Sequence, residues 1–280
     1  MIVSVASGKG GTGKTTVAVN LASTQGSRIR LLDCDVEEPN ARLFFKGAAC
    51  GHPETVTRPI PEVDEGQCDG CGECSRFCEF KALAVLGRRV LVFPELCHGC
   101  GGCMRVCPKG AIREIPKRIG TVSIHTADGL SVVEGRLDVG VAMAPPLIHA
   151  VKKKALAPEK GDTILDAPPG TACPVTATLH GSDYVLLVTE PTPFGLHDLT
   201  LAVEMVRELR LPFGVVINRA DSGDDRVREY CRKEWITVLA EIPDDRRIAE
   251  AYSRGELLVE ALPEYRTLFK HLWDKVRGQA

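Results

Sequence analysis

A glycine-rich octapeptide, residues 8–15 (GKGGTGKT), follows the first apolar stretch of the chain. It matches the pattern G-x-x-x-x-G-K-[ST] and lies between a predicted strand at residues 2–7 and a predicted helix at residues 16–24. Glycines let backbone N–H groups surround a phosphate, while the lysine reaches the β- and γ-phosphate oxygens and the last hydroxyl binds Mg²⁺. The pattern predicts a nucleotide site formed by Gly8, Gly10, Gly11, Thr12, Gly13, Lys14, Thr15 and Thr16.

Apolar strands alternate with amphipathic helices over most of the chain. This alternation predicts an α/β fold with a mostly parallel sheet covered on both faces. The predicted strand and helix pairs are 183–191 with 197–210, 212–220 with 224–235, and 236–243 with 244–255, preceded by a hairpin at 121–135, a helix at 145–156 and a buried strand at 162–167.

Eight of the twelve cysteines lie in two runs of the same spacing, C-x₂-C-x₂-C-x₃-C. The runs repeat at an offset of 29 residues, from Cys68 to Cys97 (97 − 68 = 29). In bacterial ferredoxins this spacing binds two [4Fe–4S] clusters, and the fourth cysteine of each run binds the cluster of the other run. Zinc sites usually have longer spacings and disulfides are rare in the cytoplasm, so both are disfavoured. The predicted ligand sets are Cys68, Cys71, Cys74 and Cys107 for one cluster, and Cys97, Cys100, Cys103 and Cys78 for the other.

The composition changes to cysteine, glycine and charged residues between about Pro59 and Pro116. We therefore predict a small α+β ferredoxin-like domain at residues 59–117. It would be inserted in a discontinuous P-loop domain made of residues 1–58 and 118–280.

Lys9 gives the phosphate loop the form K-G-G-T-G-K-T, and the chain thereby resembles the MinD, ParA and nitrogenase iron protein group of ATPases. The resemblance implies a nucleotide-dependent homodimer in which Lys9 reaches the partner's phosphates. Residues 33–40 resemble the switch I segment of that group, where Asp35 would position or activate the attacking water. Residues 166–170 resemble switch II, and Asp166 would act on Mg²⁺ through water. With Lys14, these residues are the catalytic candidates.

Base recognition is predicted from the segment Asn218-Arg219-Ala220-Asp221. It is one substitution away from the N-K-x-D by which GTPases read guanine, so GTP is one alternative. In the resembled family Asn218 would instead contact adenine, and the chain near Pro243 would form the other wall. ATP is the favoured nucleotide.

Four cysteines fall outside the two runs. Free cysteines are usually small buried apolar residues, which is the expectation for Cys50 and Cys231. Cys34 lies within switch I. Cys173 follows Asp166 by seven residues, a spacing that resembles one cluster ligand of the nitrogenase iron protein. For these two, packing or switch geometry is favoured over a third cluster.

The charge and the termini bear on partners and location. A net charge of −2 gives no reason to expect DNA as a partner. The chain starts without a basic leader, and no stretch approaches the roughly 18 apolar residues of a membrane span, which predicts a cytoplasmic protein.

Residues 263–277 have helical apolar spacing. They form either a closing helix packed on the sheet, which is favoured, or a membrane-binding helix such as that of MinD.

Three functions fit these observations. The first is an ATPase that couples its nucleotide state to electron transfer toward a redox partner. The second is an iron-sulfur cluster carrier or assembly ATPase resembling the Mrp group, although the C-x-x-C of that group near the C-terminus is absent. The third is a positioning ATPase of the MinD or ParA kind with redox-sensing clusters.

Overall fold

The computed structural model describes residues 1–26, 29–127, 129–155 and 161–279. The strands are β1 (Ile2–Ala6), β2 (Ile29–Asp33), β3 (Ala49–Cys50), β4 (Glu54–Val63), β5 (Leu83–Leu86), β6 (Arg89–Val92), β7 (Ile112–Ala127), β8 (Leu130–Leu137), β9 (Asp162–Asp166), β10 (Tyr184–Thr189), β11 (Phe213–Asn218) and β12 (Val238–Ile242). The α-helices are α1 (Lys14–Gln25), α2 (Glu73–Phe77), α3 (Gly102–Arg105), α4 (Pro145–Ala155), α5 (Cys173–Leu179), α6 (Pro193–Glu208), α7 (Arg226–Lys233), α8 (Arg246–Ser253), α9 (Leu258–Ala261) and α10 (Arg266–Arg277). Short 3₁₀ turns are η2 (Ala41–Phe44), η3 (Pro94–Leu96) and η4 (Pro263–Tyr265).

The main sheet has the strand order β12-β11-β10-β1-β9-β2-β8-β7-β3. The strands from β12 to β8 are parallel to their neighbours, and β7 is antiparallel to β8. The predicted hairpin at 121–135 therefore exists as the β7–β8 pair. The predicted helix at 145–156 is α4, and its last position, Leu156, lies outside the described residues.

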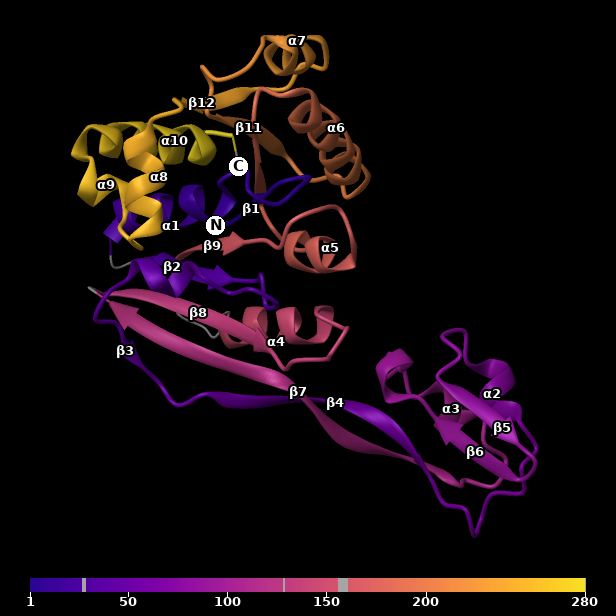
Figure 1. The fold of residues 1–280 in the computed structure, drawn as a ribbon. Coiled ribbons are helices and arrows are strands. Elements are labelled where there is room, and N and C mark those ends of the chain that lie inside the picture. The colour runs from indigo at the N-terminus through magenta and orange to yellow at the C-terminus, as the bar shows by residue number, and fades with distance from the viewer. Residues whose placement is uncertain (27–28, 128, 156–160, 280) are drawn as a thin grey trace.

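Helices cover both faces of this sheet (Figure 1). On one face α1, α9 and α10 pack against alternate residues of the central strands. On the other face α5, α6 and α7 cover β10 and β11, and α4 covers β2 and β8. Strands buried on both sides need apolar residues at successive positions, which is why their sequences read as continuous apolar runs. The predicted α/β architecture is confirmed.

The C-terminal helix α10 closes one face of the core. Phe269, Leu272, Trp273 and Val276 are buried there, and the Lys275 ammonium donates to the Leu239 carbonyl oxygen at 2.7 Å. The apolar side of α10 is thus used inside the protein, as the favoured prediction stated. In the described ranges, no helix is both long and apolar enough to cross a membrane.

β7 is 16 residues long and β8 only eight. The second half of β7 pairs with β8, from Gly120 opposite Leu137 onward, and the first half extends past β8 and pairs with β4. Because β8 is parallel to β2, this extension leaves the sheet at its carboxyl edge. We call residues 57–63 and 112–118 the stalk and residues 64–111 the cysteine lobe, which lies apart from the body (Figure 1). The boundaries predicted after residues 58 and 117 fall within these two continuous strands.

The two halves of the lobe repeat one structure. Leu83 pairs with Val92 between β5 and β6, and the positions 29 residues away, Ile112 and Val63, pair between β7 and β4 (83 + 29 = 112, 92 − 29 = 63). The hydrogen bond from Phe93 N–H to the Ala82 carbonyl oxygen, at 2.8 Å, has its counterpart at the same length between Asp64 and Ala111. The sequence repeat is therefore a structural repeat with an approximate twofold relation.

Candidate functional site

A cleft of about 510 Å³ opens at the carboxyl edge of the sheet, where α1 begins. Its volume is typical of small-molecule sites, which span roughly 300–1,000 Å³. The predicted site residues that line it are Gly10, Gly11, Gly13, Lys14, Thr15, Thr16, Asp35, Asn218 and Pro243. Of the other predicted residues, Gly8, Lys9 and Thr12 lie in the same loop outside the lining, and Asp166 is buried beneath it.

A residue at the end of β11 supports the phosphate loop through a hydrogen bond. The Asn218 side chain donates from Nδ2 to the Thr12 carbonyl oxygen at 2.9 Å. Gly13 has φ +93°, and a Cβ atom there would lie 2.4 Å from that Nδ2 atom. Only glycine fits both the backbone conformation and this close approach. The loop therefore presents its N–H groups and the N-terminus of α1 to the cleft, the arrangement that binds phosphate.

Lys14 and Asp166 form the charged floor of the cleft. Lys14 is 7% exposed, and burial lowers its pKa, whereas the nearby Asp166 and Asp35 raise it. Asp166 ends β9, and among the described residues neither of its carboxylate oxygens has a hydrogen-bond partner. Burial raises the pKa of Asp166, and the nearby Thr15 hydroxyl and Lys14 partly offset that rise. A buried carboxylate without partners, below a phosphate loop, fits a hydrated Mg²⁺ ion.

Asp33 is a site residue that sequence reasoning missed. It ends β2 beside Asp166 and is fully buried. Its Oδ2 atom accepts hydrogen bonds from the N–H groups of Asn40 and Ala41, both at 2.9 Å, and its Oδ1 atom accepts one from Asp35 at 3.2 Å. Burial raises the pKa of Asp33, and Asp166 raises it further. Asp33 thus holds switch I in place, and the available signal was a carboxylate at the end of an apolar strand.

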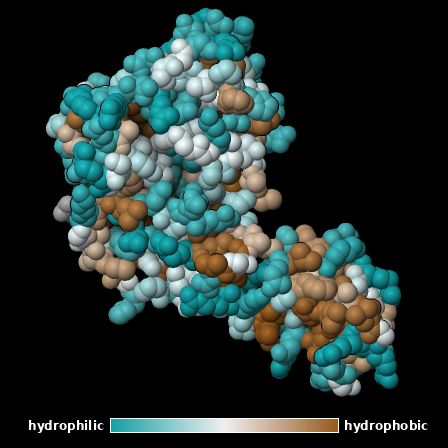
Figure 2. Space-filling view, in the orientation of Figure 1, coloured by the Kyte–Doolittle hydropathy of each residue, from teal (hydrophilic) through white to brown (hydrophobic). Residues whose placement is uncertain are grey.

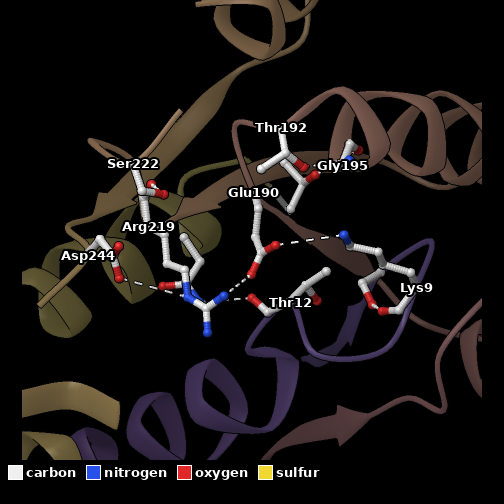
Figure 3. Close-up of polar contacts among 11 residues, drawn as sticks. Lys9, Thr12, Glu190, Thr192, Gly195, Arg219, Ser222 and Asp244 are labelled. Carbon is white, nitrogen blue, oxygen red and sulfur yellow. Dashed lines mark hydrogen bonds and ion pairs between the residues drawn. The ribbon is translucent and has the colours of Figure 1, made fainter. Parts of the chain in front are cut away.

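Lys9 contacts a carboxylate of its own chain. Its Nζ atom lies 3.7 Å from Oε2 of Glu190, which follows β10 and is 8% exposed. The other carboxylate oxygen of Glu190 accepts a hydrogen bond from Arg219 Nη1 at 2.9 Å, and Arg219 Nε lies 3.9 Å from Asp244. Figure 3 shows Glu190 between the two cations. The role predicted for Lys9 in a dimer stays a prediction.

The far wall of the cleft is formed by the loops after β11 and β12. Asn218 and Pro243 lie there, as does Tyr252 of α8. The Asp244 N–H donates to Oδ1 of Asp221 at 2.6 Å. Asp221 occupies the place of the aspartate that reads guanine in N-K-x-D, and one of its oxygens is already engaged. This arrangement favours adenine, and the contacts of Asn218 and Pro243 with the base stay predictions.

We expect Asp166→Asn to raise the melting temperature of the nucleotide-free protein by roughly 2–4 °C, because it removes one of two adjacent buried carboxylates at a gain of about 1 kcal/mol. The same change should abolish the further rise caused by Mg-ATP. Thermal unfolding with and without Mg-ATP checks both parts. Asp162→Asn is the control, because Asp162 begins the same strand and pairs with the N-terminal amine at 3.1 Å. Asp162→Asn should lower the melting temperature and keep the further rise caused by Mg-ATP. If Asp166→Asn gave that same result, the assignment of Asp166 to the Mg²⁺ site would be contradicted.

The eight cysteines of the cysteine lobe line two pockets, four cysteines in each. Each pocket takes three cysteines from one run and the fourth from the other run, which is the grouping of the predicted ligand sets. One pocket is lined by Cys68, Cys71, Cys74 and Cys107, and the other by Cys78, Cys97, Cys100 and Cys103.

Backbone donors approach the sulfurs at equivalent places in the two halves. The N–H groups of Ala82 and Ala111 donate to Cys78 Sγ and Cys107 Sγ, both at 3.4 Å. Such donors stabilise a thiolate that binds a metal group. Burial raises the pKa of the Cys103 thiol to about 11, an effect to which its cysteine neighbours add, so four thiolates in one pocket need a bound cationic centre.

Each cysteine pocket offers four thiol sulfurs as donors. Among the described residues, no three His, Cys, Asp or Glu side chains meet the geometry of a single-ion site. Four cysteines that line a pocket, rather than meet at a point, are the donor set that a [4Fe–4S] cluster uses. That the pockets hold [4Fe–4S] clusters stays a prediction at this stage.

The four remaining cysteines differ in their exposure. Cys231 is buried as expected, but Cys50 is exposed in β3, a short edge strand, so the expectation of a buried residue was wrong for it. Cys34 is buried, and burial raises its pKa well above the usual thiol range. Cys173 is exposed at the start of α5.

Comparisons with known proteins match nearly the whole chain. The family model described as "CobQ/CobB/MinD/ParA nucleotide binding domain" matches residues 3–259. An uncharacterized protein of Methanocaldococcus jannaschii is 31% identical over 258 residues, 91% of this chain and 90% of its own length. An iron-sulfur cluster carrier protein of Aquifex aeolicus is 28% identical over 94% of this chain and 63% of its own length. The septum site-determining protein MinD of Pyrococcus horikoshii, solved with Mg-ADP, has a similar fold at a TM-score of 0.61 and 20% identity, with 98% of this chain and 95% of that chain covered.

Proposed function

This chain belongs to the CobQ/CobB/MinD/ParA nucleotide-binding family, and from that premise we propose that it uses ATP to control electron transfer through two [4Fe–4S] clusters. The P-loop ATPase fold comes with the family. One observation carries the rest: the stalk of the cysteine lobe leaves the sheet at the carboxyl edge, where the nucleotide cleft also opens. In open α/β sheets that edge is where ligands bind, so a change at the nucleotide is made at the same edge of the sheet as the root of the stalk.

The nucleotide side of the proposal uses the floor and the loops of the cleft. Lys14 would hold phosphate oxygens at the N-terminus of α1, and Thr15 and Asp166 would hold Mg²⁺. Asp35 would orient the attacking water. In a homodimer closed around two nucleotides, Lys9 would leave its own Glu190 and reach the partner's phosphates.

The redox side of the proposal uses the eight cysteines of the lobe. When bound, a [4Fe–4S] cluster accepts and releases one electron at a potential set by its surroundings. Phe77, Phe80 and Phe93 are 51%, 43% and 41% exposed in the lobe. Figure 2 shows hydrophobic surface over the same part of the molecule. Exposed apolar surface of this kind suits the docking of a redox partner protein.

Contacts lead from switch I to the stalk. Leu137 at the end of β8 donates its N–H to the Val36 carbonyl oxygen at 2.8 Å. Arg42, just after switch I, lies 2.8 Å from Glu134 of β8 through its Nε atom. β8 pairs with β7, which continues into the stalk. A rearrangement of switch I on hydrolysis would therefore act on the strand that carries the lobe.

A cluster carrier is the second candidate, because iron-sulfur cluster carrier proteins are among the relatives. The lobe argues against it as the main activity. Each pocket draws cysteines from both halves of the lobe, so releasing a cluster means separating the halves. A site that encloses its cluster in this way favours retention over delivery.

We expect about eight irons per chain after anaerobic purification, and EPR spectra or midpoint potentials of the reduced protein that shift with Mg-ATP but not with Mg-ADP. The shift follows from the contacts that link switch I to β8, and through β8 to the strand that continues into the stalk. EPR-monitored redox titration with each nucleotide measures it. Eight irons with no nucleotide effect would contradict the coupling, and loss of iron to an added apo-protein would favour the carrier.

A further inference from the structure

Arg58 joins three parts of the molecule. It lies on β4 in the stalk and is 5% exposed. Its Nη1 and Nη2 atoms donate to the carbonyl oxygens of Cys97 and Pro94 in the lobe. Nη1 also lies 3.6 Å from Sδ of Met143, in the loop of the body that precedes α4. The half of the lobe that carries Cys97 is therefore anchored to the body through one buried guanidinium.

The protein compensates the charge of Arg58 only in part. Within the described ranges Arg58 makes no ion pair, and its Nε atom is buried without a partner. Glu95, the acid next to Pro94 in the chain, pairs with Lys117 at 3.0 Å, which lowers the pKa of Glu95, and the charge of Arg58 adds to that lowering without a direct ion pair. A buried cation whose hydrogen-bond partners are carbonyl oxygens and a sulfur, with one exposed acid at longer range, is stabilised further by a nearby negative group. A thiolate-bound cluster at Cys97 would be such a group.

The approximate twofold relation of the lobe shows that this cation has no counterpart. The position equivalent to Arg58 is Gly87 (58 + 29 = 87), which has no side chain. The same offset relates Gly70 to Gly99 and Arg88 to Pro59: a Cβ atom at Gly99 would lie 2.9 Å from the Pro59 carbonyl oxygen, and one at Gly70 would lie 2.8 Å from the Arg88 Cα atom. Two sites of equal ligation thus differ by one buried positive charge.

A second difference between the halves acts in the opposite direction. The rings of Phe80 and His98 stack at a centroid distance of 3.5 Å beside the pocket of Cys97, whereas the equivalent residues, Lys109 and Asp69, form an exposed ion pair at 3.8 Å. An apolar cover makes the addition of negative charge harder. Without Arg58, the pocket of Cys97 would therefore be the harder of the two to reduce.

We propose that Arg58 is a tuning residue that raises the reduction potential of the cluster held by Cys97, Cys100, Cys103 and Cys78, and leaves the other cluster unchanged. This inference rests on the proposed function, because it needs both clusters. Reduction adds a negative charge, and a buried cation at the ligand backbone stabilises it. The electron is thereby held in the half of the lobe that is anchored to the ATPase body.

The test is an EPR-monitored redox titration of the Arg58→Gln variant of the whole 280-residue chain. One of the two midpoint potentials should fall by at least the equivalent of a tenfold change in the one-electron equilibrium, about 59 mV, while the other stays in place. Arg89→Gln is the matched control. It removes the same charge from an exposed arginine of the lobe, which pairs with Glu65 at 2.9 Å, and neither potential should move as far.

A second variant keeps the test decisive if Arg58→Gln does not fold. Met143→Glu places a carboxylate beside the guanidinium and cancels its field, so the same single potential should fall relative to Met143→Gln. Unchanged potentials in a folded, iron-loaded variant would overturn the proposal, as would an equal shift of both potentials. An iron content near zero in the unaltered protein would instead remove the proposed clusters themselves, which separates the two failures.

Discussion

Lys14→Ala should weaken nucleotide binding by about 10- to 100-fold and abolish ATP hydrolysis, while the iron content of the protein stays the same. The lysine is the one predicted phosphate-binding cation that lines the cleft, and it is almost fully buried beside Asp166 and Asp35. A charged hydrogen bond contributes roughly 1.5–3 kcal/mol, and 2.8 kcal/mol corresponds to about a hundredfold in affinity. Equilibrium binding of a fluorescent ATP analogue and iron analysis of the same preparation measure the two parts.

Lys152→Ala serves as the control for this prediction. Lys152 is a partly buried lysine of α4 whose ammonium donates to the carbonyl oxygens of Ala177, Thr178 and His180 at 2.6–3.1 Å. Its loss should lower stability and leave nucleotide affinity unchanged. If Lys14→Ala lost its iron together with its nucleotide, the cleft and the lobe could not be treated as separate sites.

Local motifs made part of the site predictable. The phosphate loop combines its glycines, Lys14 and the first turn of a helix within eight residues, so the sequence alone predicted a nucleotide site and the groups expected to bind the phosphates. The cysteine runs are equally local, and their repeat at 29 residues is enough by itself to indicate a duplicated unit. Alternating strands and helices predicted the parallel sheet for the same reason, because each element is encoded by its own segment.

Features that depend on contacts between distant segments could not be predicted from the sequence. Glu190 and Arg58 are ordinary charged residues in the sequence, and only the fold places them beside Lys9 and Cys97. The stalk was missed because β4 and β7 are read as two unrelated stretches until their pairing is known. Asp33 was passed over in favour of Asp35, because a motif shows the order of two carboxylates but not which one is buried.

The exchange of the fourth cysteine between runs predicts an unusual result for double substitutions. Cys68→Ala/Cys107→Ala removes two ligands of the same pocket, so about half of the iron should remain. Cys97→Ala/Cys107→Ala removes one ligand from each pocket, although both residues lie in one run, and nearly all iron should be lost. Iron and sulfide analysis after anaerobic purification distinguishes the two variants, with Cys50→Ala/Cys231→Ala as the control that keeps all iron. If each run held its own cluster, the two results would be reversed, since Cys97 and Cys107 would then serve one cluster while Cys68 and Cys107 served two.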